Sequence, residues 1–260
     1  MSTTWTRRVW TTLGSVLTVV VLASVLLQVL GVLGRSSVRV DRELSADGIE
    51  ALVVDVTEGS VEIRGTDSTR IRVTGSVHSG LATTEHTERT EGARFVVRAR
   101  CPGITAANFC SVDHVIDVPR GLHVVVRSRN TSVVLSDLSG SVDVTTSDAS
   151  VEADRLSGPL TIRTSNDSID ARDMRSTSNR FETSNGRVRA EFVVEPETVQ
   201  VSTSEDSVAI VVPDTPATYA VGLDTSNDEQ ITSVRTDPSS PRRIDVDTSN
   251  GGIVVRYPRD

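Results

Sequence analysis

Several residue types are scarce in this chain, and each scarcity narrows what the protein can be. Aromatic residues make up only 3% of the sequence, although ligand and sugar sites are commonly lined by aromatic side chains. The two cysteines allow one disulfide but are too few for a cysteine-based metal site. Lysine is absent, so all 27 basic residues are arginine. From these scarcities we expect no catalytic residues, no metal ligands and no cofactor.

Positive charge is also in short supply. The chain has 35 acidic residues against 27 basic ones, a net charge of −8. The first 34 residues contain no acid and two arginines, so the remainder has 25 basic and 35 acidic residues, a net charge of −10. This balance disfavours nucleic acid and anionic lipid as ligands of that remainder.

A short polar triplet recurs through the second half of the chain. Thr-Ser-Asn or a close variant starts at positions 128, 146, 164, 183, 203, 225 and 248. A recurrence near twenty residues indicates a repeat architecture in which each unit stacks on its neighbours. The triplets end at Asn130, Asp148, Asn166, Asn185, Glu205, Asn227 and Asn250.

Apolar residues alternate on both sides of each triplet, so each unit predicts a strand, a polar corner and a second strand. The pattern around the third triplet is given by Leu160, Ile162, Ile169 and Ala171. Two units depart from it. Asn179 stands where an apolar residue is expected before Phe181, and after Asn227 the apolar residue slips to Ile231.

Two folds fit this pattern. In a parallel β-solenoid the corners stack about 4.8 Å apart, and aligned Asn side chains hydrogen-bond along the stack. In the alternative, Asn185-Gly186 and Asn250-Gly251 are hairpin turns between antiparallel strands. Because a hairpin does not require the preceding Thr-Ser, we predict an all-β, right-handed parallel solenoid (β-helix) of about seven coils. The seven triplet-ending residues would form its corner ladder in chain order, with Asn185 between Asn166 and Glu205.

The amino-terminal segment contains a long apolar run. Residues 9–33 are almost wholly apolar and, at 25 residues, would span about 37 Å as a helix. We therefore predict a transmembrane helix over 9–34. A cleaved signal peptide ending near Gly34 is the alternative, and Arg7-Arg8 also resembles a twin-arginine export signal. The predicted location is the cell membrane, single-pass, with the carboxyl-terminal part extracytoplasmic.

Five segments follow from these patterns. They are a short cytoplasmic tail (1–8), the transmembrane helix (9–34), a polar stalk (35–48), an irregular β cap (49–127) and the repeat solenoid (128–258). The cap covers the first open coil, whose bare strand edges would otherwise recruit other chains. Cap and solenoid are expected to form one structural unit.

The cap contains both cysteines and all four histidines. Cys101 and Cys110 are predicted to form a disulfide, which would persist only in an oxidising compartment; two unpaired thiols are the alternative. The polar stretch 81–92 is expected to be a loop. The histidines, with no nucleophile motif nearby, are expected to sit apart and to carry no site: His78, His86, His114 and His123.

Two kinds of chemistry compete with a purely structural role of the corners. Asp167, Asp206 and Asp228 each follow a triplet, and stacked carboxylates can bind Ca²⁺. However, no Gly-Gly-x-Gly-x-Asp repeat is present, and acidic residues at turns are expected for backbone reasons alone. Acid pairs such as Asp170 with Asp173 would suit a polysaccharide-active enzyme, but such pairs arise freely in so acidic a chain.

Three short motifs occur in a specific order. Residues 59–65 read Gly-Ser-Val-Glu-Ile-Arg-Gly, residues 118–121 read Val-Pro-Arg-Gly before a strand, and serial Thr-Ser-Asn-Gly corners follow. Together they resemble the bacterial putative adhesin family over roughly residues 49–257. The resemblance implies a β-solenoid in an envelope protein, and it implies no catalytic residues.

These observations support two functional hypotheses. The first is a non-catalytic surface interaction module, adhesin-like or scaffolding, that is anchored in the membrane and binds an unidentified protein or cell-surface polymer. The alternative is the sensory or regulatory ectodomain of an envelope-stress system. That alternative requires a helix face such as Gly31-x-x-Gly34 to engage a partner in the membrane.

Overall fold

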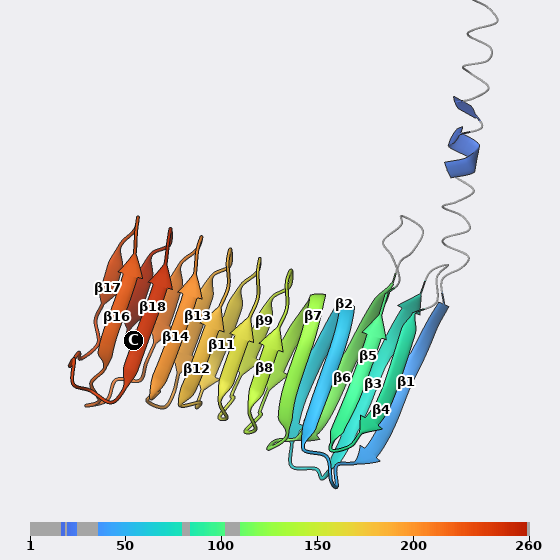
Figure 1. Ribbon diagram of the computed structural model, residues 1–260, viewed down its shortest axis with the longest axis horizontal. Coiled ribbons are helices and arrows are strands. Elements are labelled where there is room, and N and C mark those ends of the chain that lie inside the picture. The colour runs from blue at the N-terminus through green and yellow to red at the C-terminus, as the bar shows by residue number, and fades with distance from the viewer. Residues whose placement is uncertain (1–16, 19, 25–35, 80–83, 102–109, 259–260) are drawn as a thin grey trace, which may run out of the picture.

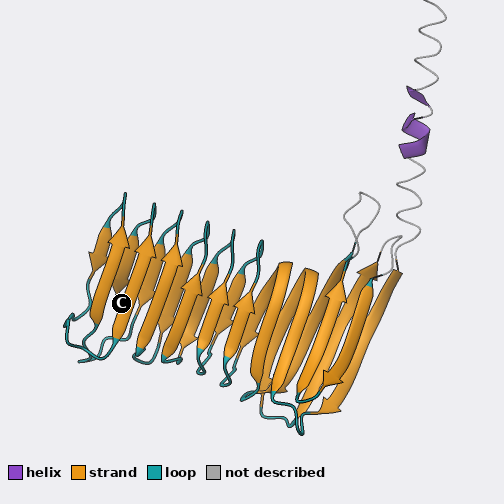
Figure 2. Ribbon diagram, in the orientation of Figure 1, coloured by secondary structure: helices purple, strands orange, loops and turns teal. Residues whose placement is uncertain are grey.

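Two long β-sheets face each other in the computed structural model, which describes residues 17–18, 20–24, 36–79, 84–101 and 110–258 (Figures 1 and 2). The strands nearest the amino terminus are β1 (Ser36–Ser45), β2 (Ala51–Thr66), β3 (Arg70–Ser79), β4 (Glu85–Glu91), β5 (Arg94–Arg100), β6 (Ser111–Pro119) and β7 (His123–Ser136). The shorter repeat strands are β8 (Val142–Thr145), β9 (Val151–Asp154), β10 (Leu160–Arg163), β11 (Ile169–Met174), β12 (Ser178–Glu182), β13 (Val188–Phe192), β14 (Thr198–Thr203), β15 (Val208–Val211), β16 (Ala220–Thr225), β17 (Gln230–Thr232), β18 (Arg243–Thr248) and β19 (Ile253–Arg256).

The long strands β2 and β7 belong to both sheets, because each turns the corner from one sheet to the other. The first sheet runs β4-β5-β2-β7-β8-β10-β12-β14-β18-β16. The second runs β1-β3-β6-β2-β7-β9-β11-β13-β15-β19-β17. Among the described strands, the antiparallel pairs are confined to the cap: β1–β3, β3–β6 and β4–β5. The repeats therefore stack in parallel.

The alternating pattern places one continuous apolar core between the sheets. In β10, Leu160 and Ile162 are 2% and 0% exposed, whereas the next residue, Arg163, points to solvent. The same alternation holds in the neighbouring repeat strands, so each coil contributes its inward residues to one shared core. Asn179, which breaks the pattern, is nevertheless buried, and its side-chain amide donates a hydrogen bond to the Ser176 carbonyl at 3.0 Å.

The Asn-Gly corners are not hairpins. Asn185-Gly186 connects β12 to β13, but β12 pairs with β10 and β14, whereas β13 pairs with β11 and β15. The two strands flanking the corner thus lie in opposite sheets. This geometry excludes the antiparallel alternative for this corner.

The last two coils stack in an order that differs from the chain order. Strands β18 and β19 lie between the β14–β15 coil and the β16–β17 coil, and they pair in parallel with both. The chain therefore leaves β15, forms the terminal coil, and returns to fill the position it skipped (Figure 1). The prediction that the corners stack in chain order was wrong for Asn227 and Asn250.

Burial explains this order. The inserted coil has a regular apolar pattern, and its inward residues Ile244, Val246, Ile253 and Val255 are at most 2% exposed. The terminal coil has the slipped pattern, with Val221 and Leu223 only partly buried and Ile231 40% exposed. A coil at the end of the stack has a neighbour on one side only, so the coil with less apolar surface to bury takes that place.

One segment of the predicted stalk and one of the cap differ from their predicted structure. Residues 36–45, predicted as a polar stalk, form strand β1 at the edge of the second sheet. The polar stretch 81–92, predicted as a loop, contains β4 at the edge of the first sheet. Both strands are polar because each edge strand keeps one side in solvent. The stack also begins earlier than predicted, since β2 pairs with β7 on both sides of the corner.

The predicted transmembrane helix over 9–34 was wrong. No helix in the described part of the chain is both long and apolar enough to cross a bilayer. Within that segment the described residues 17–18 and 20–24 are helical, and the rest, like the predicted tail 1–8, lies outside the described residues. The predicted single-pass membrane location depended on that helix and falls with it.

Candidate interaction surface

Buried threonines hold each corner to the neighbouring coil on its cap side. The threonines that open five of the triplets are between 3% and 7% exposed: Thr146, Thr164, Thr183, Thr203 and Thr248. The Thr183 hydroxyl donates to the Asp167 carbonyl at 3.2 Å, and the Thr203 hydroxyl donates to the Gly186 carbonyl at 3.1 Å. The hydroxyl thus satisfies a corner carbonyl that no strand partner reaches.

The middle serine contributes its backbone. The Ser165 carbonyl accepts hydrogen bonds from the backbone N–H groups of Ser184 and Asn185, at 3.1 and 3.0 Å. The same arrangement recurs one coil later, where the Ser184 carbonyl accepts from Ser204 and Glu205. The serine side chain is exposed and is not needed for this contact.

The last residue of each triplet forms a hydrogen-bonded ladder on the outside of the corner. In every rung, an Asn side-chain N–H donates to the residue on its cap side. The rungs are Asn130 to Glu58 (2.6 Å), Asn166 to Asp148 (2.6 Å), Asn185 to Asn166 (2.7 Å), Asn250 to Glu205 (3.3 Å) and Asn227 to Asn250 (2.8 Å). All seven triplet-ending residues lie in this ladder, with Glu58 of β2 as an additional first member. Such exposed bonds contribute about 0.5–1.5 kcal/mol each.

The ladder consists of three runs, each of which starts at an acid. Among the described residues no ladder bond joins Asn130 to Asp148, or Asn185 to Glu205. At both steps an amide oxygen faces a carboxylate, and two acceptors cannot hydrogen-bond to each other. A carboxylate accepts but cannot donate a hydrogen bond, so an acidic residue fits only at the first position of a run.

A shallow groove lies on the outer face of the first sheet near the carboxyl-terminal end. It has a volume of about 430 Å³ and crosses β12, β14, β18 and β16. The floor of the groove includes a row in which Gln200, Asp245 and Gly222 lie in register on neighbouring strands. The floor is low there because Gly222 has no side chain. Ser202, Asp247 and Asp224 form the next row. The inserted coil β18–β19 supplies the centre of the groove.

The two ends of the groove differ in charge pairing. At the β12 end, Arg180 contacts Glu182 and donates to the Gln200 side chain at 3.0 Å. Partial burial would raise the pKa of Glu182, but hydrogen bonds from Arg180 and Arg163 outweigh it and hold the pKa below its usual value. The charged side chains at this end of the groove are thus paired with one another.

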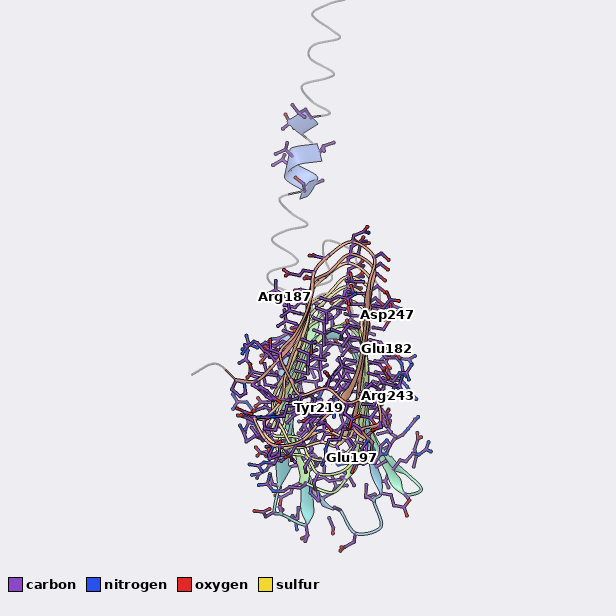
Figure 3. All side chains as sticks on the ribbon, turned by 90° about the vertical axis from the view of Figure 1, so that its left-hand side faces the viewer. Glu182, Arg187, Glu197, Tyr219, Arg243 and Asp247 are labelled. Carbon is purple, nitrogen blue, oxygen red and sulfur yellow. A yellow bond between two sulfur atoms is a disulfide. The ribbon has the colours of Figure 1, made fainter. Side chains whose placement is uncertain are left out.

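At the β16 end the acids are less well compensated. Arg243 binds Asp245, but Asp224 and Asp247, adjacent in register, have no ion-pair partner among the described residues. Like charges placed directly opposite on neighbouring strands destabilise a sheet. In the end-on view of Figure 3, Glu182, Arg243 and Asp247 lie on one flank of the stack, and Arg187 lies on the other. The groove therefore presents uncompensated negative charge on a single flank.

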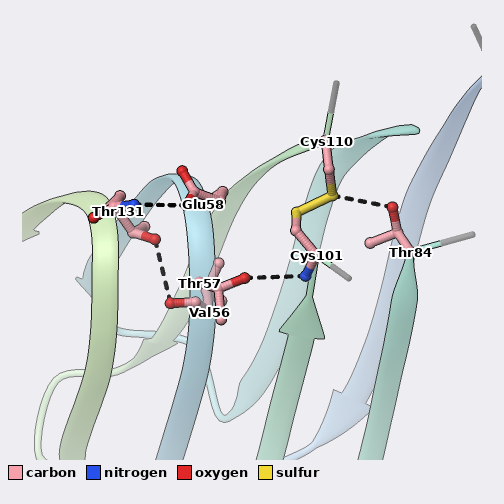
Figure 4. Close-up of a disulfide and its surroundings, with 8 residues drawn as sticks. Val56, Thr57, Glu58, Thr84, Cys101, Cys110 and Thr131 are labelled. Carbon is pink, nitrogen blue, oxygen red and sulfur yellow. Dashed lines mark hydrogen bonds between the residues drawn. A yellow bond between two sulfur atoms is a disulfide. The ribbon is translucent and has the colours of Figure 1, made fainter. Parts of the chain in front are cut away.

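The predicted disulfide is present at the opposite end of the molecule. Cys101, after β5, is bonded to Cys110, before β6, with their Cα atoms 5.7 Å apart (Figure 4). The bridge links the first sheet to the second, because β5 and β6 belong to different sheets. Thr84 contacts the Cys110 sulfur at 3.2 Å.

The histidines do not all sit apart. His78 and His123 lie on the outer faces, where His78 contacts Ser76 and His123 contacts Ser141. His86 and His114 instead meet between the sheets, with their Nε2 atoms 3.1 Å apart. The prediction that no histidines come together was wrong, because it treated 81–92 as a loop and so gave His86 no inward face.

Sequence reasoning also missed the groove. Its residues come from four strands between residues 180 and 247, and none belongs to a motif. The one available signal is Gly222, a glycine in an outward strand position, which marks a place where the surface is hollow.

Comparison with known proteins gives only distant matches. No protein-family model matches the chain, and no curated protein matches it. Among solved structures, the chain is similar to a putative cell adhesion protein from Clostridium sporogenes, at 9% identity and a TM-score of 0.37, over 86% of this chain and 100% of that chain. A putative adhesin from Bacteroides fragilis matches at 8% identity and a TM-score of 0.36, over 86% of this chain and 98% of that one.

A third neighbour has a different description. A putative lipid binding protein from Parabacteroides distasonis matches at 12% identity and a TM-score of 0.24, over 85% of this chain and 97% of that one. The structural neighbours thus include bacterial proteins described as putative adhesins, in agreement with the resemblance seen in the sequence. Likenesses this distant indicate no ligand for the present chain.

Proposed function

We propose that this protein is a non-catalytic binding module that holds an extended polymer carrying amino and hydroxyl groups in the groove on the outer face of β12, β14, β18 and β16. The observation that carries the proposal is the pair Asp224 and Asp247, which stand side by side on an open, hollowed face without a cationic partner among the described residues.

The chemistry of the groove matches such a ligand. A protonated amine between Asp224 and Asp247 would relieve the repulsion between the two carboxylates. Ser202 and Gln200 offer hydroxyl and amide groups, which bind sugar hydroxyls. The parallel strands repeat these groups about every 4.8 Å across the face, so a polymer lying across the strands can be held at several points.

The sensory alternative required Gly31-x-x-Gly34 to engage a partner in the membrane, and those residues lie outside the described part of the chain. A binding module requires only an accessible surface. The volume of about 430 Å³ lies within the range of small-ligand sites. It fits one or two sugar units of a longer chain.

Binding can be measured by titration calorimetry with chitosan oligosaccharides, which carry free amines, and with fully acetylated chitin oligosaccharides of the same length as a matched neutral probe. We expect the amine form to bind at least tenfold more tightly, because one charge-assisted hydrogen bond contributes about 1.5–3 kcal/mol. The difference should shrink as salt is added. The oligosaccharide should be recovered intact.

Two variants locate the site. The double variant Asp224→Asn and Asp247→Asn should lose the preference for the amine form, whereas Gly222→Leu should weaken both probes by filling the groove. Both should remain folded, because these positions face solvent and a Cβ at Gly222 approaches only the Asp245 side chain, at 2.9 Å. Equal binding of the two probes, or unchanged binding by both variants, would contradict the proposal, as would cleavage of the oligosaccharide.

A further inference from the structure

Two histidines and one glutamate converge inside the cap. His86 and Glu88 alternate along β4, so both point between the sheets, and His114 points inward from β6 in the opposite sheet. The His86 and His114 Nε2 atoms are 3.1 Å apart, and the Glu88 Oε1 atom lies 3.5 Å from the His86 Nε2 atom. One ligand atom from each of the three residues lies within 4.8 Å of the other two.

These groups are buried without enough hydrogen-bond partners. His114 is 1% exposed, and the Glu88 side chain is 6% exposed. Neither the Glu88 Oε1 atom nor the His114 Nδ1 atom has a hydrogen-bond partner among the described residues. A buried carboxylate oxygen without a partner is costly, so the Glu88 Oε1 atom is left in need of one.

We propose that His86, Glu88 and His114 bind a zinc ion. Zinc binds nitrogen and carboxylate oxygen at about 2.0–2.2 Å in tetrahedral geometry, which places its ligand atoms about 3.3 Å apart. The separations of 3.1 and 3.5 Å lie on either side of that value. Two nitrogen ligands also favour zinc over Ca²⁺ or Mg²⁺, which prefer oxygen.

The surroundings suit a bound metal. Arg42 donates to the Glu88 carbonyl at 2.8 Å and lies 3.6 Å from the other carboxylate oxygen, Oε2. It holds Glu88 in place while leaving Oε1 for the metal. The described residues bring three ligand groups together, which leaves the fourth tetrahedral position for water.

The position of the site assigns it a role. Strand β4 is an edge strand that pairs with β5 alone among the described strands, whereas β6 lies in the facing sheet. Zinc would therefore connect the two sheets at their open end. The Cys101–Cys110 bridge connects the same two sheets nearby. We assign the zinc a structural role, as a second clamp across the cap.

Zinc content and thermal unfolding of the full chain, without affinity histidines, test this proposal. After chelator treatment, titration with ZnCl₂ should show one equivalent bound, and CoCl₂ should give the visible spectrum of a tetrahedral complex. Zinc at one hundred times its Kd should raise the melting temperature by roughly 5–10 °C. CaCl₂ and MgCl₂ should have no such effect.

Variants distinguish the cluster from adventitious zinc binding. Glu88→Gln keeps the shape of the side chain, and His86→Asn changes a partly exposed position; each should weaken zinc binding at least tenfold and abolish the shift in melting temperature. His78→Asn, an exposed histidine on β3, is the matched control and should bind zinc as the native chain does. The proposal is overturned if folded native protein takes up no zinc, in which case one shared proton between the Nε2 atoms accounts for the histidine contact. Unchanged zinc binding by either cluster variant would overturn it equally.

Discussion

Gly186→Ala should lower the free energy of unfolding by about 3 kcal/mol, because the corner leaves no room for a side chain. A Cβ at this position would lie 1.9 Å from the carbonyl oxygen of Asp167 in the preceding coil. That oxygen belongs to backbone and accepts a hydrogen bond from Thr183, so it cannot move without disturbing the corner. The requirement for glycine here comes from close approach between coils.

Urea unfolding followed by circular dichroism measures this effect. Gly121→Ala is the matched control, since a Cβ there would have no heavy atom within 4 Å, and it should change stability by less than about 0.5 kcal/mol. If the Gly186 and Gly121 variants unfold at the same urea concentration, the corners are not packed as closely as the structure shows.

Phe181→Ala should lower the free energy of unfolding by about 3–5 kcal/mol, the cost of removing a fully buried aromatic ring. Phe181 is 0% exposed and lies in register between Ile162 of the preceding coil and Val201 of the next. Its removal would leave a cavity that the two flanking coils cannot fill, because their backbones are fixed by parallel hydrogen bonds.

The control for this prediction is Phe181→Leu, which keeps most of the volume and should cost less than about 1.5 kcal/mol. Both variants are compared by their urea midpoints. When the slope of the unfolding free energy against urea concentration is unchanged, a shift in the midpoint reports a change in stability alone. Equal losses from the two variants would mean that Phe181 does not fill the core between the sheets.

The parallel repeat could be anticipated from sequence because each of its elements is local. Threonine at the start of the triplet is buried, serine offers its carbonyl, and Asn reaches the neighbouring coil on its cap side. These three roles recur at a similar spacing. Alternating apolar residues such as Leu160 and Ile162 then determine which side of each strand faces the core.

The order of the last coils could not be anticipated in the same way. Ile244 and Val246 fit equally well beside Val199 and Val201 or at the end of the stack. Each position in the parallel stack offers the same register of inward-facing residues. The two possible orders can be told apart only by comparing the two coils. One coil has a regular apolar pattern, whereas in the other Ile231 is displaced from its expected position and is exposed. The groove is formed by strands that this order brings together, so it could not be predicted from local sequence patterns either.

The cap was predicted less well for a different reason. Edge strands are polar on their outer side, so β4 has the composition of a loop, and its inward residues His86 and Glu88 are themselves polar. The alternation of His86 and Glu88 with exposed residues was the available signal. His114 shows it more clearly, since it occupies an inward position among Val112, Ile116 and Val118.

Cross-linking at the corners tests the central claim, that β18 and β19 are inserted between the β14–β15 coil and the terminal coil and so create the groove. Cysteines are introduced in pairs at the exposed corner serines Ser204, Ser226 and Ser249, with the native disulfide intact. A disulfide requires Cα atoms within about 7 Å, which adjacent coils satisfy at about 4.8 Å and coils two steps apart, at about 10 Å, do not. We predict that the Ser204–Ser249 pair oxidises and that the Ser204–Ser226 pair does not. The reverse result would place the coils in chain order and contradict the inserted position of β18 and β19.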